Sequence, residues 1–321
     1  MKLGVFTVPL YDRNVEEAFK YLSNLGVQAV EIGTGGFPAN THLNPVEALE
    51  NPHKINDMKW LLSEYNLTIS ALSCHGNPVH PNKETAQSYH TDFVNTCKLA
   101  EKLGVDTVVT FSGCPGDHEG AKYSNWVTSA WPNEFMDILK YQWDDVLIPY
   151  WKEATVLAAN HGVTKIAIEM HPGFCVYNPR TLLKLREAVG TAIGANFDPS
   201  HLFWQGIKPT EALKALKSAV YHFHAKDTRI DPFNTAVNGT LETASYADIL
   251  NRGWVFRTVG YGTSESEWKA IISALRAIGY DGAISIEHED MLMSAEEGLE
   301  KAVKFLKPIL IYDSAAEMWW V

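Results

Sequence analysis

Residues 165–198 read KIAIEMHPGFCVYNPRTLLKLREAVGTAIGANFD, and this stretch decides the fold. Its first five residues form a short apolar run typical of a buried strand, and the run ends on Glu169. An amphipathic segment follows at Arg180–Val189, and a second apolar run, Ala192–Asp198, comes after it. A strand, a helix and another strand in this order predict two parallel strands joined by a crossover helix.

The same alternation continues along the whole chain. The predicted strands are Lys2–Val8, Val27–Gly33, Leu67–Cys74, Thr107–Ser112, Lys165–Glu169, Ala192–Asp198, Ala219–Ala225 and Ala283–Glu287. The predicted helices are Asn14–Leu25, Ile55–Tyr65, Glu84–Leu103, a helix from Glu134 to His161 that Pro149 kinks into two pieces, Arg180–Val189, Pro209–Ser218, Glu265–Ile278 and Ser294–Leu306. Eight such units predict a (β/α)8 TIM barrel, and the absence of any linker predicts a single domain spanning residues 1–321.

Two of the predicted connections are much longer than usual. Gly113–Asn133 and Lys226–Gly262 both follow the carboxyl end of a strand, which is the end where barrel active sites lie. We therefore expect both to lie on the active-site side and to cover it in part. The apolar pair Trp319-Trp320 near the end of the chain either docks on its own barrel or forms an oligomer contact.

Composition limits the classes of partner. The net charge of −11 argues against a nucleic-acid or anionic-membrane partner, because phosphate binding needs a basic surface. No run of 18 apolar residues exists, so no transmembrane helix is expected. The start of the chain lacks a signal-peptide pattern, and the four cysteines form no CxxC motif. These features predict a cytoplasmic protein with reduced thiols.

Acidic residues and histidines stand at the ends of the last four predicted strands. A carboxylate at the end of an apolar strand is costly to desolvate unless it is paired or binds a cation. One explanation covers Glu169, Asp198, His224 and Glu287 together, namely that they converge on one divalent metal ion. Three carboxylates and one imidazole suit Mn²⁺ best, with Mg²⁺, Co²⁺, Fe²⁺ or Zn²⁺ as alternatives.

This pattern resembles the xylose isomerase-like superfamily of barrels, which contains sugar phosphate isomerases and epimerases. The resemblance extends over essentially the whole chain, and it also takes in inosose dehydratases and the catalytic subunits of C-glycoside deglycosidases. It implies the same four metal ligands, and it implies substrate contacts for His201, in Asp-x-x-His, and for Arg229. It also leaves room for a homo-oligomer or a small partner subunit beside a small-molecule sugar substrate.

Further residues near the strand ends are weaker candidates for substrate binding. His75 could contact substrate or make a structural hydrogen bond, and His171 could be an acid or base or a loop residue bonded to backbone. Lys226 could orient a substrate oxygen or pair with Asp227. Glu31 could reach a substrate hydroxyl, although a salt bridge is the more ordinary role for such a residue.

The ligand set predicts the first chemical step. A metal that polarises a carbonyl needs a nearby base to remove the α-proton, and Glu169 and Glu287 are the candidate catalytic bases. A sugar isomerase or epimerase acting on a keto-sugar through an enediolate is the leading prediction. A lyase or dehydratase acting on a keto-glycoside or inosose begins with the same step and is the alternative. A barrel without catalytic activity is disfavoured by the intact ligand set.

An apurinic endonuclease would share this barrel but needs three zinc ions and further histidines. Phe111-Ser112-Gly113 stands where one of those histidines belongs, and no histidine occurs between His224 and His288. Together with the acidic charge, these gaps argue against a nuclease.

Overall fold

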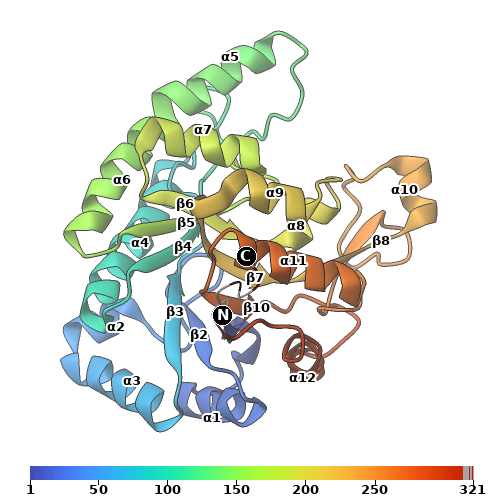
Figure 1. Cartoon of the computed structure of the whole chain (residues 1–321). Helices are drawn as coiled ribbons and strands as arrows, with labels where there is room; N and C mark the ends of the chain where they lie inside the picture. Colours follow the sequence, from blue (N-terminus) through green and yellow to red (C-terminus); the bar gives the residue numbers. More distant parts are fainter. Residues whose placement is uncertain (314–317, 319, 321) are drawn as a thin grey trace.

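The computed structural model describes residues 1–313, 318 and 320. Within these residues, eight parallel strands close into a barrel in the order β1-β10-β7-β6-β5-β4-β3-β2 (Figure 1). The barrel strands are β1 (Lys2–Phe6), β2 (Ala29–Gly33), β3 (Thr68–Ser73), β4 (Thr107–Phe111), β5 (Lys165–Glu169), β6 (Ile193–Phe197), β7 (Val220–Ala225) and β10 (Ala283–Ile286). The predicted TIM barrel is confirmed. Trp319 of the apolar tail, which either docks on the barrel or forms an oligomer contact in the sequence prediction, lies outside the described residues.

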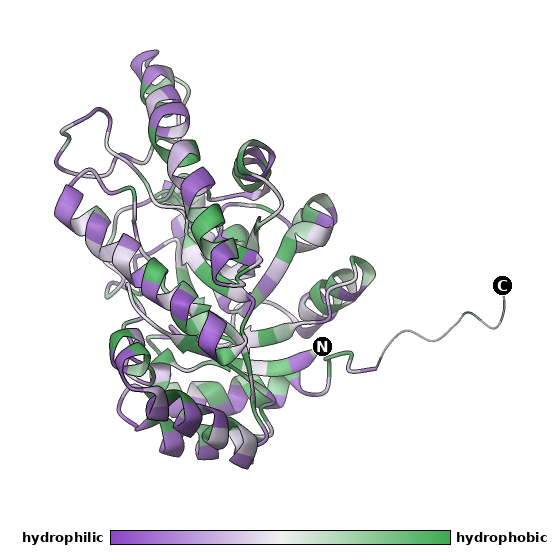
Figure 2. Cartoon of the chain, turned by 90° about the vertical axis from the view of Figure 1, so that its left-hand side faces the viewer, coloured by the Kyte–Doolittle hydropathy of each residue, from purple (hydrophilic) through white to green (hydrophobic). Residues whose placement is uncertain are grey.

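Helices surround the barrel and turn their apolar sides toward the strands (Figure 2). Their bounds are α1 (Val15–Leu25), α2 (Pro45–Glu50), α3 (Pro52–Glu64), α4 (Lys83–Leu103), α5 (Glu134–Lys140), α6 (Ile148–Asn160), α7 (Pro179–Val189), α8 (Pro199–Phe203), α9 (Pro209–Leu216), α11 (Glu265–Ala277) and α12 (Ala295–Leu306). Local sequence sets several of these ends. Asn14 and Glu17 form a capping box at the start of α1, and Gly26 ends that helix in the left-handed conformation. No helix in the described part of the chain is long and apolar enough to cross a membrane.

The helix predicted to run from Glu134 to His161 is interrupted, but the interruption begins at Tyr141, before Pro149. A π-helical segment, Tyr141–Leu147, joins α5 to α6, and Pro149 lies in the first turn of α6. A π-turn inserts an extra residue and rotates the side chains beyond it. In this segment Gln142 and Trp143 are buried. The short helices α2 and α8 were not predicted.

The second long connection has a structure of its own, which the sequence did not predict. Strands β8 (Asp227–Ile230) and β9 (Trp254–Arg257) pair antiparallel, and α10 (Pro232–Asn238) lies between them in sequence. These elements project from one side of the barrel (Figure 1). We call residues 227–257 the insertion.

Asp227 fixes the point where the insertion leaves the barrel and returns to it. Its buried carboxylate accepts hydrogen bonds from the backbone N–H groups of Thr228, Gly260, Gly262 and Thr263, from the Thr263 hydroxyl and from the Trp268 indole, at 2.9–3.2 Å. The predicted alternative, in which Lys226 pairs with Asp227, is wrong, because these donors occupy the carboxylate and Lys226 turns to other partners.

The barrel interior changes character from bottom to top. At the bottom, the small side chains of Ala71, Val109 and Ala167 pack with Tyr221. Above them the interior is polar yet fully buried. Its members include Glu31, Ser73, Asn196, His222, His224 and Ser285. Buried polar groups persist only when they are hydrogen-bonded or charge-paired, so this upper layer is where a functional site is expected.

Replacing Asp227 with asparagine tests its structural role. Asparagine replaces one carboxylate oxygen with an N–H₂ group, which cannot accept hydrogen bonds from the donors around this position. We therefore expect the free energy of unfolding to fall by about 2–4 kcal/mol. Denaturant unfolding measures this loss. Asp231→Asn is the matched control, because Asp231 caps α10 and asparagine caps equally well. Equal stability of the two variants would contradict the role given to Asp227.

Candidate metal centre

The four predicted metal ligands come together at the carboxyl ends of the strands. Glu169 ends β5, Asp198 follows β6 and caps α8, His224 lies in β7, and Glu287 follows β10. One ligand atom each from Glu169, His224 and Glu287 lie within 4.8 Å of one another. Asp198 joins this group through Lys226, whose Nζ lies 3.2 Å from Asp198 Oδ2 and 2.8 Å from Glu287 Oε2.

His224 is oriented by carboxylates on both sides of its ring. Its Nε2 lies 2.9 Å from both carboxylate oxygens of Glu31, and its Nδ1 lies 3.2 Å from Glu169 and 3.1 Å from Glu287. Because Glu31 accepts the proton on Nε2, Nδ1 is the nitrogen that faces the two predicted ligands. The Phe6 ring stacks on the imidazole at 5.5 Å between ring centroids and limits its rotation.

Glu31 acts from below the site and does not line the cavity. It is fully buried on β2 and accepts hydrogen bonds from the hydroxyls of Ser73 and Ser285. Burial opposes ionisation, but the neighbouring His224 and His222 outweigh it and lower the pKa of Glu31 to about 2. The salt-bridge interpretation of this residue is therefore confirmed. A carboxylate behind a metal-ligating histidine is a common way to fix the tautomer and orientation of that ring.

Glu169 is held by three neighbours: His75 after β3, Asn196 on β6 and His201 in α8. His75 donates from Nε2 to Glu169 Oε2 at 3.1 Å, and Asn196 donates to the same oxygen at 2.9 Å. His201 Nε2 lies 3.2 Å from the other oxygen. Although burial raises its pKa, these imidazoles, with His224, hold the pKa of Glu169 well below its usual range. The carboxylate is therefore ionised and fixed in position.

Sequence reasoning missed Asn196 and His222. Asn196 donates to Glu169 and accepts from His222 Nδ1 at 3.1 Å, so the two residues link β6 to β7 beneath the site. Each stands two positions before a predicted ligand, Asp198 or His224. Side chains two apart in a strand share one face, so this spacing is the signal that could have found them.

Several buried atoms at this site have no hydrogen bond. In the described part of the chain such atoms include His201 Nε2 and His224 Nδ1, and also Asp198 Oδ2 and Glu287 Oε2, which have only ion-pair contacts with Lys226 at 3.2 and 2.8 Å. Leaving a buried polar atom unsatisfied is costly, and four such atoms in one cluster share a cause if a cation belongs among them. Two carboxylate oxygens and two imidazole nitrogens are ordinary donors to a divalent transition metal ion. The residues present therefore fit a metal.

Lys226 supplies a positive charge beside these carboxylates. Its buried ammonium contacts Glu287, Asp198 and, at 3.1 Å, Glu289, and it lies 4.8 Å from the centre of the Phe256 ring. Burial opposes the charge, but Asp198 and Glu287 hold the pKa of Lys226 well above its usual range. Burial also raises the pKa of Asp198 to about 7, although Lys226 counteracts the rise.

His171 and His201 lie close together, and burial lowers the pKa of both imidazoles. Their ring centroids lie 4.1 Å apart, and burial is the main cause that lowers the pKa of His171 to about 3. His171 Nδ1 donates to the Pro172 carbonyl at 2.6 Å, so Nε2 is left as an acceptor. The interpretation of His171 as a backbone-bonded loop residue is therefore confirmed, and its role as an acid or base stays a prediction.

A cavity of about 290 Å³ gives access to the cluster. Among its lining residues are His75, Glu169, His171, Lys226 and Glu287, which the sequence had proposed as substrate-binding or catalytic. His201 is buried behind this surface.

Arg229 does not line this cavity among the described residues. It is exposed on β8, where it pairs with Val255. Its role in substrate binding stays a prediction. Phe256 of the insertion does reach the site, because its ring lies 5.4 Å from that of His201. The insertion thus contacts a residue of the site, but none of the described residues that line the cavity belongs to it, so partial cover of the site stays a prediction.

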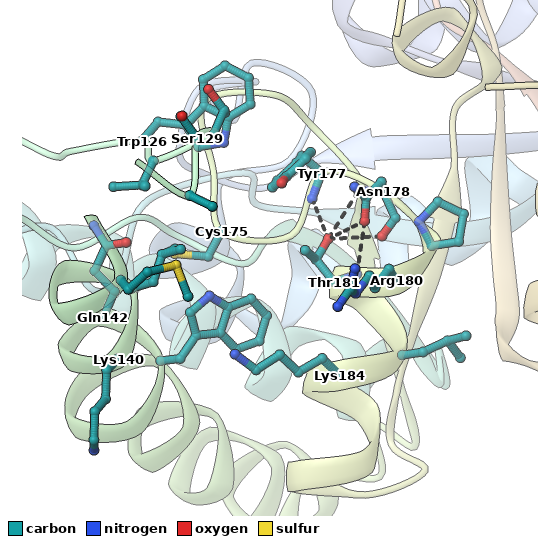
Figure 3. Close-up of a pocket in the computed structure, with 18 of the residues that line it drawn as sticks. Trp126, Ser129, Lys140, Gln142, Cys175, Tyr177, Asn178, Arg180, Thr181 and Lys184 are labelled. Carbon is teal, nitrogen blue, oxygen red and sulfur yellow. Dashed lines mark hydrogen bonds between the residues drawn. The ribbon is translucent and has the colours of Figure 1, made fainter. Parts of the chain in front are cut away.

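The other long connection borders a separate and larger cavity of about 1210 Å³ (Figure 3). Trp126 and Ser129 of this connection face Lys184 of α7 and the π-helical segment across it. Lys184 lies over the Trp143 ring, 4.0 Å from its centre. None of the four predicted ligands is among the described residues that line this cavity, so it is not part of the metal site.

Fold and site together define the class of protein: a (β/α)8 barrel with a carboxylate–imidazole cluster at the carboxyl ends of its strands. A family model described as xylose isomerase-like TIM barrel matches residues 19–309, and the chain belongs to this family. The resemblance seen in the sequence is confirmed.

Known relatives support the same placement. The chain is 41% identical to the uncharacterized protein YfiH of Bacillus subtilis over 309 residues, which cover 96% of this chain and 98% of that protein. Three solved structures share the fold at low identity. They are the IolI protein with a bound zinc atom (TM-score 0.67, 21% identity, 98% and 100% of the two chains), the probable 3-DHS dehydratase AsbF of Bacillus anthracis (0.67, 16%, 96% and 99%) and the 3-keto-D-glucoside 4-epimerase YcjR of E. coli (0.64, 14%, 96% and 98%).

Metal analysis tests the centre directly. After loading with Mn²⁺ and desalting, we expect about one ion per chain, and His224→Ala should abolish this retention because it removes the central donor. Glu31→Gln should weaken metal affinity roughly 10–100-fold, since it removes the charge that orients His224. Elemental analysis and calorimetry give the two values.

Glu211→Gln is the control for these variants, because Glu211 is an exposed glutamate on α9 with no role at the site. Full retention of the ion by His224→Ala would refute the centre.

Proposed function

We propose that this protein is a divalent-metal-dependent isomerase or epimerase that acts on a keto-sugar or a sugar derivative. One observation carries the proposal: two carboxylates, those of Glu169 and Glu287, lie 3.2 and 3.1 Å from the ring nitrogen His224 Nδ1, and both residues line the same cavity. Mn²⁺ is the ion that we propose for the site, because three of its four donors are carboxylates.

The chain's own residues would carry out the proton transfers. When bound, the ion would polarise the substrate carbonyl and lower the cost of forming an enediolate. Glu169 or Glu287 would take the α-proton, since both are ionised and lie at the cavity surface. Burial alone would raise the pKa of Glu287, but Lys226 and His224 hold it well below the usual range. Carboxylates from two different strands allow a proton to leave one face and return to another.

A lyase or dehydratase is the second candidate, and Lys226 is the observation that favours it. Its ammonium lies in the cavity wall beside Glu287 and can donate a hydrogen bond to a departing oxygen. Elimination would begin with the same α-proton removal. The similarity to AsbF, described as a probable dehydratase, is one of fold alone at 16% identity.

We also propose a small-molecule substrate and no nucleic-acid partner. The net charge of −11 opposes phosphate-backbone binding, and the cavity of about 290 Å³ is at the small end of the range for ligand sites. The cytoplasmic location and the homo-oligomer or small partner subunit stay predictions.

The first chemical step can be followed in D₂O. With a keto-sugar substrate, we expect solvent deuterium to enter the α-position, and Glu169→Gln and Glu287→Gln each to slow this exchange about 10²–10⁴-fold. NMR measures the exchange, and metal content is checked in each variant. Glu211→Gln again serves as the control and should exchange at the normal rate.

The opposite result has a defined meaning. Product formed without solvent deuterium, and without a primary isotope effect at the α-carbon, would show a hydride shift. The two glutamates would then be ligands and not bases.

A nuclease assay tests the excluded activity. Given Zn²⁺ and DNA with an abasic site, the protein should leave the strand intact, because further zinc-ligating histidines are missing and the surface charge is acidic. A gel assay decides this. Strand cleavage that disappears in Glu169→Gln would overturn the exclusion.

A further inference from the structure

The cavity of about 1210 Å³ between α7 and the long connection after β4 has no part in the chemistry proposed above (Figure 3). We call it the α7 cavity. None of the four predicted metal ligands is among the described residues that line it. Ligand sites in proteins usually occupy roughly 300–1,000 Å³, so the α7 cavity has room for a ligand of its own.

One wall of the α7 cavity departs from regular α-helical geometry. The π-helical segment supplies Gln142, Trp143 and Asp144 to this wall. π-helical turns are rare and occur frequently at functional sites. Buried Gln142 donates from Nε2 to the carbonyl of Pro115 at 3.2 Å and to that of Asn125 at 2.6 Å. These hydrogen bonds hold the long connection against the π-helical segment, so the cavity exists before any ligand enters it.

Positive charge exceeds negative charge along this cavity. Arg180 and Lys184 lie about one helical turn apart on α7, and neither forms an ion pair within the described part of the chain. Lys140 also lines the cavity, but it pairs with Asp144 at 3.2 Å. Glu187 is the remaining acidic residue among the described lining residues. Such an excess of cations stands out in a chain whose net charge is −11, and it favours an anionic ligand.

The ammonium group of Lys184 lies over an aromatic ring. Its Nζ is 4.0 Å from the centre of the buried Trp143 ring, which limits the directions that this long side chain can take. Burial lowers the pKa of Lys184, and the neighbouring Arg180 lowers it further, although Asp144 opposes the shift. An anionic group between Arg180 and Lys184 would compensate both positive charges at once.

Apolar side chains line the same cavity and remain open to solvent. Met136 and Leu183 are 50% and 36% exposed. Beside them the rings of Trp126 and Tyr177 pack edge to face, with their centroids 5.5 Å apart (Figure 3). Covering these four side chains with a flat apolar group would release water from them and stabilise the complex.

The start of α7 is fixed by its own capping contacts. The Thr181 N–H donates to Asn178 Oδ1 at 3.0 Å, and the Tyr177 N–H donates to the Thr181 hydroxyl at 3.0 Å (Figure 3). Arg180 lies between Asn178 and Thr181 in this capped turn. The backbone that carries Arg180 and Tyr177 is therefore ordered before binding, which lowers the entropic cost of binding a ligand.

We propose that the α7 cavity binds a small organic anion that combines a carboxylate with a flat apolar group. The carboxylate lies between Arg180 and Lys184, because a guanidinium group matches the geometry of two carboxylate oxygens. The apolar group packs against Trp126 and Tyr177. This site is separate from the metal centre, and its occupation does not depend on the proposed function.

Two probes that share one ring system test the charge requirement. They are 2-naphthoate and 2-naphthamide, which differ in the negative charge. With the Mn²⁺-loaded protein at low ionic strength, we expect calorimetry to show 2-naphthoate binding about 5- to 20-fold more tightly than the amide. In the double variant Arg180→Gln/Lys184→Gln, the ratio of the two affinities should fall to about twofold or less.

A second variant tests the apolar part of the cavity. Trp126→Ala should weaken both probes by about threefold or more and leave their ratio unchanged, because it removes ring contacts and no charge. The matched control is the double variant Lys54→Gln/Lys59→Gln, which also removes two positive charges. Both lysines are exposed on α3 and neither lines the cavity, so this variant should keep the wild-type affinities.

Several results would overturn the α7 cavity as a site for such an anion. They are equal affinities in the wild type, no binding of either probe, or an unchanged ratio in Arg180→Gln/Lys184→Gln, which would place the carboxylate at the metal centre or elsewhere. A dimer in sedimentation that the same double variant dissociates would show a second copy of the chain in the cavity, and it would overturn the proposal too. Every readout is binding or mass, so a failure of the proposed sugar chemistry would leave this site standing.

Discussion

The buried contact between Glu31 and His224 is the interaction on which the site depends. Neither group can be buried without a partner, because the free-energy cost of burying an isolated charge exceeds the net stability of a folded domain. Paired across the barrel from β2 to β7, they fix which nitrogen of His224 points upward and where it points. The positions of Glu169 and Glu287 around that nitrogen follow from this choice.

Above this pair, negative charge exceeds positive charge in a very small volume. Lys226 offsets part of the excess by contacting Asp198, Glu287 and Glu289. It is attached to the chain and cannot satisfy every buried ligand atom, and His224 Nδ1 remains without a hydrogen bond. A divalent cation bound among these groups would complete the balance. The excess negative charge that destabilises the fold thus favours the binding of a cation at this site.

Sequence alone predicted the barrel and placed the four predicted ligands at one rim of it. It succeeded because Glu169 and Glu287 end apolar runs, where a carboxylate has no structural reason to be. Sequence reasoning failed where contacts between distant parts of the chain determine the structure. The role of Asp227 depends on a loop that returns more than thirty residues later, and the outward direction of Arg229 depends on its register with Val255. The π-helical segment has no marker in composition.

The position of β10 in the barrel has a consequence for how the site forms. This strand pairs with β1 on one side and β7 on the other, so it closes the ring between segments far apart in the chain. Glu287 follows it directly, and the insertion separates it from His224 along the chain. Contacts of such long sequence separation form slowly, because loop closure must precede them. Binding of the proposed ion is therefore expected late in folding, after the barrel has closed.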